Sequence, residues 1–252
     1  MTADLSRIHN RLLAALSPKT LGRLLPHIRP VALLGGMTID HVDEPVSWMY
    51  FVNRGLVSLV KTMQDGRTVE IGSVGTEGVT NPLALFGVEN AIVEAMVQGP
   101  GNALRISRAI VETEVASDPA FARLMQRYVY FALGQAAQTA ACNRLHNLEQ
   151  RCSRWVLIAD DSAGGDKFTL THQFLAMMLG APRPSVSLAA KALQRAGYID
   201  YVRGIVSVLD LAGLEGASCE CYAETQMALD ELFPARADEP ADQPPRRSAG
   251  KA

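Results

Sequence analysis

The chain has 252 residues, which is enough for about two domains of ordinary size. Hydrophobic residues make up 48% of it and charged residues 20%, so a globular core is expected, while the net charge of −2 does not by itself indicate nucleic-acid binding. No apolar run approaches the roughly 18 residues that a membrane span needs, and the N-terminal region has no signal-peptide core. We therefore expect a cytoplasmic protein with no membrane partner, whose cysteines are reduced.

The N-terminal half of the sequence changes from helical to strand patterns near residue 30. Apolar residues recur at helical spacing between residues 4 and 28, and Ser17-Pro18 marks the start of a second short helix. From Val31 onward, short apolar runs alternate with Gly, Asp and Asn, and turn signals at residues 53–55 and 64–67 separate the runs. About eight strands with this punctuation are typical of a double-sheet β-roll or jelly roll. We place it, with the N-terminal helices, in a domain of residues 1–117, as part of an α+β protein.

A long dimerisation helix is predicted over residues 118–147, where Asp118 suits the cap and Pro119 the first helical position. Seven residues in it follow alternating steps of four and three, the spacing of a coiled-coil seam: Leu124, Tyr128, Phe131, Gln135, Gln138, Cys142 and Leu145. At 1.5 Å per residue, about 29 residues span about 43 Å, which is longer than one such domain needs. We therefore expect a homodimer, the alternative being a single helix packed on its own β-roll.

The segment from Phe168 to Gly204 has the pattern of two short helices, a turn between them and a β-hairpin after them. Thr171 suits the N-cap of the first helix, and Gly180 can take the positive φ that ends it. Pro184 suits the first turn of the second helix, whose inward face would be Val186, Ala189, Ala190 and Leu193. Two strands then meet at Arg203-Gly204. This pattern is typical of a winged helix-turn-helix, the alternative being a compact helical hairpin that binds no DNA.

Positive charge gathers in this segment although the whole chain is slightly acidic. Between Lys167 and Gly204 the sequence has five Lys or Arg residues and one acid, Asp200, and a phosphate backbone requires such a basic patch. The candidate DNA-contacting residues are Thr171, His172, Arg183, Ser185, Ser187, Leu188, Lys191 and Arg203. Residues 148–229, with further helices at 148–160 and 211–229, form the predicted DNA-binding domain. The Pro-rich residues 230–252 are predicted to be a disordered tail.

The order of these elements resembles that of the Crp/Fnr family of bacterial transcription regulators, with a β-roll sensor, a long dimerisation helix and a winged helix-turn-helix. The resemblance covers residues 15–225 and is most specific at residues 143–152, in the helix-turn-helix of Phe168–Ile199 and in the hairpins of Tyr50–Glu70. It implies a homodimer that binds a two-fold-related double-stranded operator, with recognition helices about 34 Å apart. It also implies that a signal in the β-roll, from an unidentified small-molecule effector, alters their placement, and it makes RNA polymerase a candidate partner.

The β-roll departs from the cyclic-nucleotide-binding members of that family. Those members place a Gly-Glu pair, and then an Arg-Ser or Arg-Thr pair, around the cyclic phosphate. The candidate pocket positions here are Gly75, Glu77, Val93 and Glu94. Loss of the arginine removes the bidentate clamp on the phosphate, and Glu94 would repel it, so we expect an effector other than cyclic AMP. Iron–sulfur members carry an N-terminal cysteine cluster, whereas this chain has no cysteine before Cys142, so that sensor is not expected either.

The second helix of the helix-turn-helix also departs from the family's best-known readers. They offer Arg-Glu followed by Arg four residues after the Glu, whereas these positions hold Arg183, Pro184 and Leu188. Arg183 can still contact guanine O6 and N7 through two hydrogen bonds, and Leu188 can contact a thymine methyl group. Arg203, at the tip of the wing, is expected to meet phosphate. The operator should therefore differ from that of the best-known members.

Cys219 and Cys221 form a C-x-C pair that is weak as a metal site, because it offers two ligands where zinc needs four. The sequence therefore predicts no metal and no cofactor, and the two cysteines are interpreted as small apolar residues. A thiol-redox role for the pair, and a disulfide between Cys142 and its symmetry mate, are the alternatives. His41 is the candidate haem ligand in the β-roll.

An enzyme is not expected, because the sequence contains no nucleophile elbow, P-loop, dinucleotide fingerprint or zinc-ligand spacing. The predicted function is that of a sequence-specific DNA-binding transcription regulator acting as a homodimer. The alternative is a ligand- or thiol-redox-sensing binding protein whose helix-turn-helix mediates protein contacts.

Overall fold

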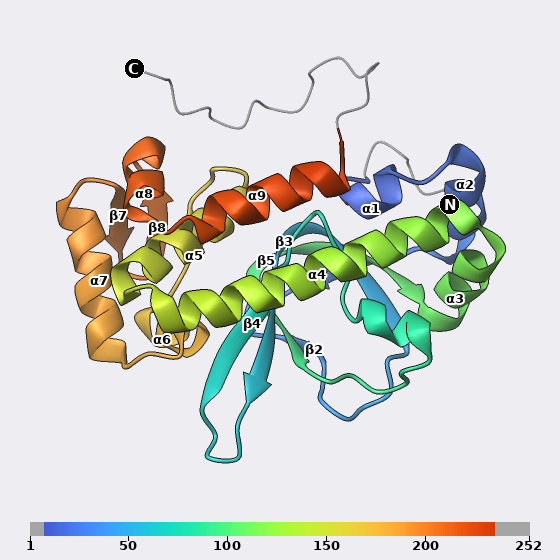
Figure 1. Ribbon diagram of the computed structural model, residues 1–252, viewed down its shortest axis with the longest axis horizontal. Coiled ribbons are helices and arrows are strands. Elements are labelled where there is room, and N and C mark those ends of the chain that lie inside the picture. The colour runs from blue at the N-terminus through green and yellow to red at the C-terminus, as the bar shows by residue number, and fades with distance from the viewer. Residues whose placement is uncertain (1–7, 235–252) are drawn as a thin grey trace. The chain divides into compact units, whose positions relative to one another are not determined.

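The computed structural model describes residues 8–234, which divide into two compact units at Ala140 and Ala141, inside one long helix. Both units mix helices with antiparallel strands (Figure 1), which confirms the predicted α+β class. Within the described range no helix combines the length and the apolar character that crossing a membrane would require.

The N-terminal unit begins with short helices. They are α1 (Arg11–Ala14), α2 (Pro18–Leu24) and the 3-10 turn η2 (Leu25–His27). The side chains of Asn10 and Ser17 cap α1 and α2 by accepting hydrogen bonds from backbone amides three residues ahead. The predicted helices are therefore confirmed from Arg11 onward, and the predicted helical residues 4–7 lie outside the described residues.

A five-stranded antiparallel sheet follows, in the order β1-β5-β3-β4 with β2 paired to β5. The strands are β1 (Arg29–Leu33), β2 (Thr38–Asp40), β3 (Trp48–Thr62), β4 (Thr68–Val74) and β5 (Glu94–Ser107). Buried apolar side chains from these strands make the core of the roll: Leu33, Tyr50, Val52, Val57, Val74, Ala95, Val97 and Ala103. The predicted β-roll is thus confirmed, although its strands are fewer and longer than expected.

Long strands replace several of the predicted short ones, and the turn predicted at residues 53–55 is wrong. β3 continues through this segment beside β5, and their register shifts between Val52 and Val57. Gly55 takes a φ of 97°, and a Cβ there would lie 2.4 Å from the carbonyl oxygen of Gly99. Gly55 therefore forms a bulge where two backbones approach closely, rather than a hairpin turn. The turn at residues 64–67 is confirmed, with Gly66 at a φ of 82°.

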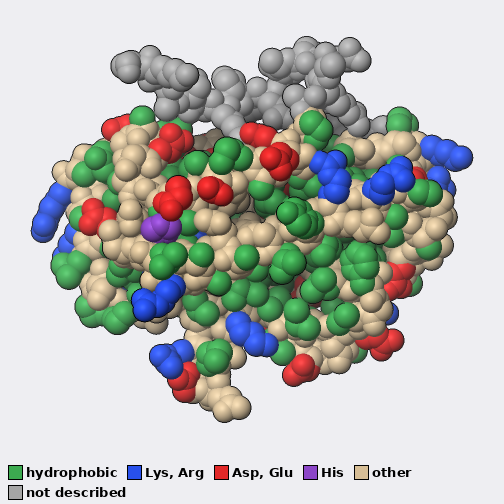
Figure 2. Space-filling view, in the orientation of Figure 1, with side chains coloured by type: hydrophobic (Ala, Val, Ile, Leu, Met, Phe, Trp, Pro, Cys, Tyr) green, Lys and Arg blue, Asp and Glu red, His purple; other side chains and the backbone are tan. Residues whose placement is uncertain are grey.

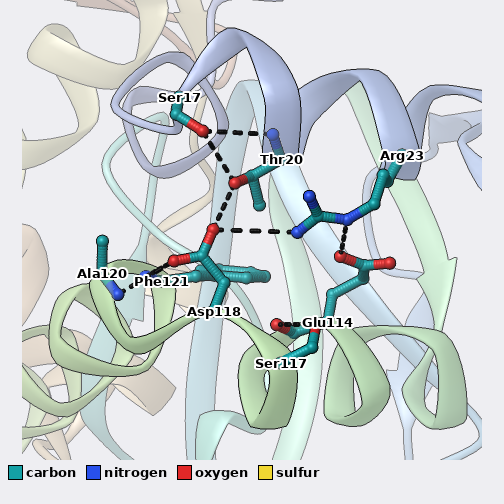
Figure 3. Close-up of polar contacts among 8 residues, drawn as sticks. All are labelled: Ser17, Thr20, Arg23, Glu114, Ser117, Asp118, Ala120 and Phe121. Carbon is teal, nitrogen blue, oxygen red and sulfur yellow. Dashed lines mark hydrogen bonds and ion pairs between the residues drawn. The ribbon is translucent and has the colours of Figure 1, made fainter.

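Two helices that the sequence did not predict complete the first unit. They are η3 (Pro82–Phe86) and α3 (Arg108–Ser117), and α3 leads into the predicted long helix, α4 (Pro119–Leu145). Asp118 lies between α3 and α4, and one of its carboxylate oxygens accepts hydrogen bonds from the amides of Ala120 and Phe121. The other accepts from the Thr20 hydroxyl and lies 3.7 Å from the guanidinium of Arg23 (Figure 3). One cap residue thus joins α4 to α2.

Replacing Asp118 by asparagine should make the stability of the protein less dependent on acid pH. The hydrogen bonds from Thr20, Phe121 and Ala120 hold the pKa of Asp118 below its usual value. This stabilisation is therefore present above the pKa of an unfolded aspartate, about 3.9, and is lost as the pH falls through the lower folded value. In urea unfolding, wild type should be more stable than Asp118→Asn at neutral pH, and the difference should shrink in acid. A difference that is the same at both pH values would contradict this role.

The side of α4 that carries the predicted seam packs against the β-roll of its own chain. Tyr128 is 2% exposed, and its hydroxyl lies 3.1 Å from both the amide nitrogen and the carbonyl oxygen of Val79. The side-chain oxygen of Gln135 accepts a hydrogen bond of 2.9 Å from the amide of Ser73, and Phe131 is buried. The predicted seam is therefore wrong at these positions, where the helix packs on its own roll. Of the other seam positions in this unit, Leu124 and Gln138 are half-buried.

The C-terminal unit contains the predicted winged helix-turn-helix. Its elements after α4 are α5 (Leu148–Ala163), β6 (Phe168–Thr169), α6 (His172–Leu179), α7 (Arg183–Arg195), β7 (Ile199–Val202), β8 (Ile205–Val208), α8 (Leu211–Ala217) and α9 (Cys221–Leu232). The helix predicted over residues 211–229 is two helices, because Ser218 is extended at φ −78° and ψ 169°. α9 continues to Leu232, so the tail predicted from residue 230 starts too early, and residues 235–252 lie outside the described residues.

Candidate nucleic-acid interface

The turn between α6 and α7 has the geometry that its sequence predicts. The Thr171 hydroxyl oxygen accepts a hydrogen bond of 3.2 Å from the amide of Phe174, which starts α6. Gly180, at a φ of 56°, ends it. Pro184 lies in the first turn of α7, where a missing amide breaks no helical hydrogen bond. These local preferences place the N-terminus of α7 at Arg183.

One face of α7 is anchored in the unit and the other is exposed. The four predicted inward residues are buried: Val186, Ala189, Ala190 and Leu193. α5 and α6 pack against α7. Arg183, Leu188 and Lys191 are exposed, with Leu188 at 68%, and Ser185 is half-buried. α7 therefore exposes two cations and an apolar side chain on a helix whose opposite face is packed in the unit.

His172 and Ser187, both candidate DNA contacts, are hydrogen-bonded to each other. The Nδ1 atom of His172 lies 3.0 Å from the Ser187 hydroxyl, and its ring packs edge-on against Tyr201 with 4.6 Å between centroids. Burial, followed by the positive charges of Arg183 and Lys191, lowers the pKa of His172. His172 is thus a neutral link between α6, α7 and β7, in the field of the cations on the exposed face.

The wing is held against the start of α6. The Leu170 amide donates to the carbonyl of Gly204 at 2.8 Å, and the Tyr201 hydroxyl donates to the carbonyl of Leu170 at 2.7 Å. Arg203 and Gly204 form the turn between β7 and β8, at φ values of 51° and 80°. Arg203 is exposed there, so the wing adds a third cation to the interface.

One small cavity in the β-roll has a lining that does not include any of the four predicted pocket residues. The Glu77 carboxylate folds back to accept a hydrogen bond of 2.7 Å from the amide of Gly75, and burial raises the pKa of Glu77. Val93 is buried, and Glu94 begins β5 opposite Val60. The cavity is lined by Ile39, Asp40, His41, Glu44, Pro45, Ser47, Trp48, Tyr50 and Ala91. Desolvation raises the pKa of Asp40 to about 6.

A cluster of three cysteines and a histidine lies in the C-terminal unit, where the sequence indicated only the two possible ligands of the C-x-C pair. Cys142 lies in the last turn of α4, and His146 directly follows the end of that helix, with its amide donating to the Cys142 carbonyl at 3.1 Å. Cys221 begins α9, and Cys219 lies two residues before it. Their ligand atoms all lie within 4.8 Å of one another. The Sγ of Cys142 is 3.6 Å from that of Cys219, so Cys142 is buried in its own chain and does not belong to a seam. Hydrogen bonding with Cys219 lowers the pKa of the Cys142 thiol.

Two family models match the chain. The cyclic nucleotide-binding domain matches residues 31–118, and the Crp-like helix-turn-helix domain matches residues 150–217. A comparison with curated proteins gives no match.

Several solved structures share the fold at low sequence identity. FixK2 from Bradyrhizobium japonicum is 18% identical with a TM-score of 0.63, and the match covers 76% of this chain and 98% of that one. Two regulators from Thermus thermophilus, TTHB099 of the CRP family and TTHA1359 of the CRP/FNR family, are each 23% identical with a TM-score of 0.62. Those matches cover 77% and 75% of this chain and 99% and 98% of the relatives. With both domain models matched in this order over more than half of its length, the chain belongs to the Crp/Fnr family of transcription regulators.

Proposed function

We propose that this regulator binds a two-fold-related DNA operator as a homodimer and responds to a signal other than cyclic AMP. The observation that carries the proposal is the exposed face of α7, with Arg183 and Lys191 on a helix whose opposite face is buried. The guanidinium of Arg183, at the start of the helix, can hydrogen-bond guanine O6 and N7 together. Lys191, and Arg203 on the wing, are suited to contacts with phosphate. RNA polymerase is proposed as a further partner on the family resemblance alone.

The exposed face of α4 supports a homodimer, although it is not the face that the sequence predicted. Tyr130 is 81% and Leu133 is 68% exposed, and Ala137 and Ala140 are exposed beside them. These positions also follow steps of three and four, the spacing at which two helices pack together. Figure 2 shows hydrophobic side chains along the face where α4 lies. We infer that a second copy of α4 covers this stripe, which we call the 130–140 stripe.

The β-roll supports a signal other than a cyclic nucleotide. At the positions that the family resemblance assigns to the phosphate-binding Arg-Ser or Arg-Thr pair, this chain has the apolar Val93 and the acidic Glu94, whereas a cyclic phosphate would need a cation. The Glu77 carboxylate accepts a hydrogen bond from the backbone amide of Gly75, two residues before it, and so is already occupied within its own turn. We infer that the effector, if it enters the roll, is not recognised through a phosphate clamp.

A mobility shift on the DNA that flanks the gene, measured over a range of salt, tests the DNA-binding proposal. If the dimer neutralises about 6–10 phosphates, affinity should fall about 10³–10⁵-fold between about 50 and 200 mM salt. Lys191→Ala removes one cation from each protomer, so it should reduce the slope of log affinity against log salt by about one for each phosphate that is no longer neutralised. DNA binding that is absent, or that does not depend on salt, would instead favour a helix-turn-helix that mediates protein contacts.

A further inference from the structure

We propose that Cys142, His146, Cys219 and Cys221 bind one borderline-soft divalent metal ion of the zinc type, in a tetrahedral site inside the C-terminal unit. Three thiolates and an imidazole are a ligand set typical of structural zinc sites. The ligands come from two segments separated by the whole helix-turn-helix: the end of α4 with the residue that follows it, and residues 219–221, which lead into α9. The site does not depend on the proposed operator or on the dimer, because all four ligands belong to one chain.

The distances between the donor atoms match a single tetrahedral ion. The Cys142 and Cys219 sulfurs are 3.6 Å apart, and the Cys221 sulfur is 3.4 Å from the Nδ1 atom of His146. With metal–sulfur bonds of about 2.3 Å and metal–nitrogen bonds of about 2.0 Å, the edges of such a tetrahedron are about 3.8 Å and about 3.5 Å. An iron–sulfur cluster would hold ligands of different irons further apart, by the width of the cluster. The limit of 4.8 Å on all pairs therefore favours one ion.

The surroundings of the four ligands suit a metal-bound state. The Nε2 atom of His146 lies 3.2 Å from a carboxylate oxygen of Glu220, which leaves Nδ1 directed at the sulfurs. A carboxylate on the second ring nitrogen is the usual outer partner of a metal-bound histidine. The guanidinium of Arg151 donates a hydrogen bond of 2.6 Å to the side-chain oxygen of Asn143, the residue next to Cys142. This positive charge suits three thiolates around a divalent ion, which together carry a single negative charge.

The burial of the ligands indicates a closed, structural site with access from an acidic cleft. The three sulfurs belong to side chains that are at most 5% exposed, so the site keeps no open position for a substrate. A cleft beside it is lined by Asp160, Asp161, Glu215, Glu220 and Asp230, together with Cys219. Acidic side chains lie along α9 in Figure 2. A cleft of this charge attracts cations and provides an entry path.

Metal binding would tie together the parts of the unit that support α7. α5 begins two residues after the ligand His146. It packs against α6, α7, α8 and α9. Since the ligands come from both ends of the unit, an ion that binds them stabilises the folded state over the unfolded chain. We therefore expect zinc to raise the thermal stability of this unit.

The test is the metal content and the metal spectrum of the full-length protein. Protein purified without an affinity tag or chelator should contain one zinc ion per protomer. The apoprotein titrated with Co²⁺ should give the intense visible bands of a tetrahedral thiolate complex, saturating at one equivalent. Cys221→Ser and His146→Ala should lower the bound metal and change the spectrum. Cys152→Ser, a buried cysteine of α5 outside the cluster, is the matched control and should retain both.

Several results would overturn the proposal. Zinc well below one equivalent, together with a weak six-coordinate Co²⁺ spectrum of wild type, would show that the four ligands do not bind an ion. Iron together with acid-labile sulfide would show that the ligands bind an iron–sulfur cluster instead of a single ion. A Cys142–Cys219 disulfide in protein purified under reducing conditions would show that these two sulfurs are bonded to each other and do not bind a metal. Because the Co²⁺ titration uses wild type, a variant that fails to fold does not affect the outcome.

Discussion

Replacing Leu133 by aspartate is expected to separate the proposed homodimer into monomers and to weaken operator binding by about 10²–10⁴-fold. Leu133 is at the centre of the 130–140 stripe, 68% exposed in one chain, and a second copy of α4 would bury it. A carboxylate there would face its symmetry mate in an apolar interface, where an unpaired charge is strongly unfavourable. Each monomer would then bind a single half-site, and the additional affinity that a dimer gains by binding two half-sites at once would be lost. Sedimentation and a mobility shift on the same preparation measure both effects.

Met227→Asp is the matched control for this substitution. Met227 is an exposed apolar residue on α9, outside the 130–140 stripe, so the same change of charge should leave the protein dimeric. Tyr130→Asp should reproduce the effect of Leu133→Asp, because the two side chains belong to the same stripe. A Leu133→Asp protein that sediments as a dimer would show that another surface joins the two copies.

The two faces of α4 show what sequence periodicity can and cannot predict. Residues 128, 131 and 135 and residues 130, 133 and 137 both follow steps of three and four, so periodicity identifies two candidate faces. Tyr128 and Phe131 are the larger apolar pair and therefore the stronger sequence candidates for a partner helix, but both are buried in their own chain, and the Tyr128 hydroxyl hydrogen-bonds to Val79. Which partner covers an apolar face depends on packing between segments far apart in the chain, and no local spacing contains that information.

The helix-turn-helix was predicted closely because its signals are local. Thr171, Gly180 and Pro184 set helix ends through backbone chemistry that involves only their near neighbours. The prediction at Gly55 is wrong for the opposite reason: a positive φ is common to a hairpin turn and to a bulge, and the close approach of Gly99, which distinguishes them, is not local. The helix α3 gave no clear signal, and it directly precedes the cap residue Asp118.

The cysteine–histidine cluster was missed although a partial signal for it exists. Cys142 and His146 are four residues apart on a predicted helix, which places both on one face. No local pattern connects them to Cys219 and Cys221, because 72 or more residues of chain lie between the two pairs. The fold brings the pairs together by returning the chain to α4 after the wing. The sequence shows each half, one pair four residues apart and the other two residues apart, but it does not show their proximity.

Arg183→Ala is expected to lower affinity for the preferred operator about 5- to 150-fold per half-site, which corresponds to about 1–3 kcal/mol. Arg183 lies exposed in the first turn of α7, followed by Pro184 in the same turn. The N-terminal residues of a recognition helix are those that reach base edges. The loss should therefore be concentrated at one base position, where selection from a random DNA library would show relaxed specificity.

Two further variants separate base recognition from general attraction to DNA. Arg183→Lys keeps the positive charge but cannot form the paired hydrogen bonds of a guanidinium, so it should lose the base preference while keeping much of the non-specific affinity. Lys191→Ala removes a cation further along the exposed face of α7 and should weaken binding to all sequences about equally. If Arg183→Ala behaved like Lys191→Ala, Arg183 would be a phosphate contact. The sequence preference of the operator would then have to come from Leu188 or from the shape of the DNA.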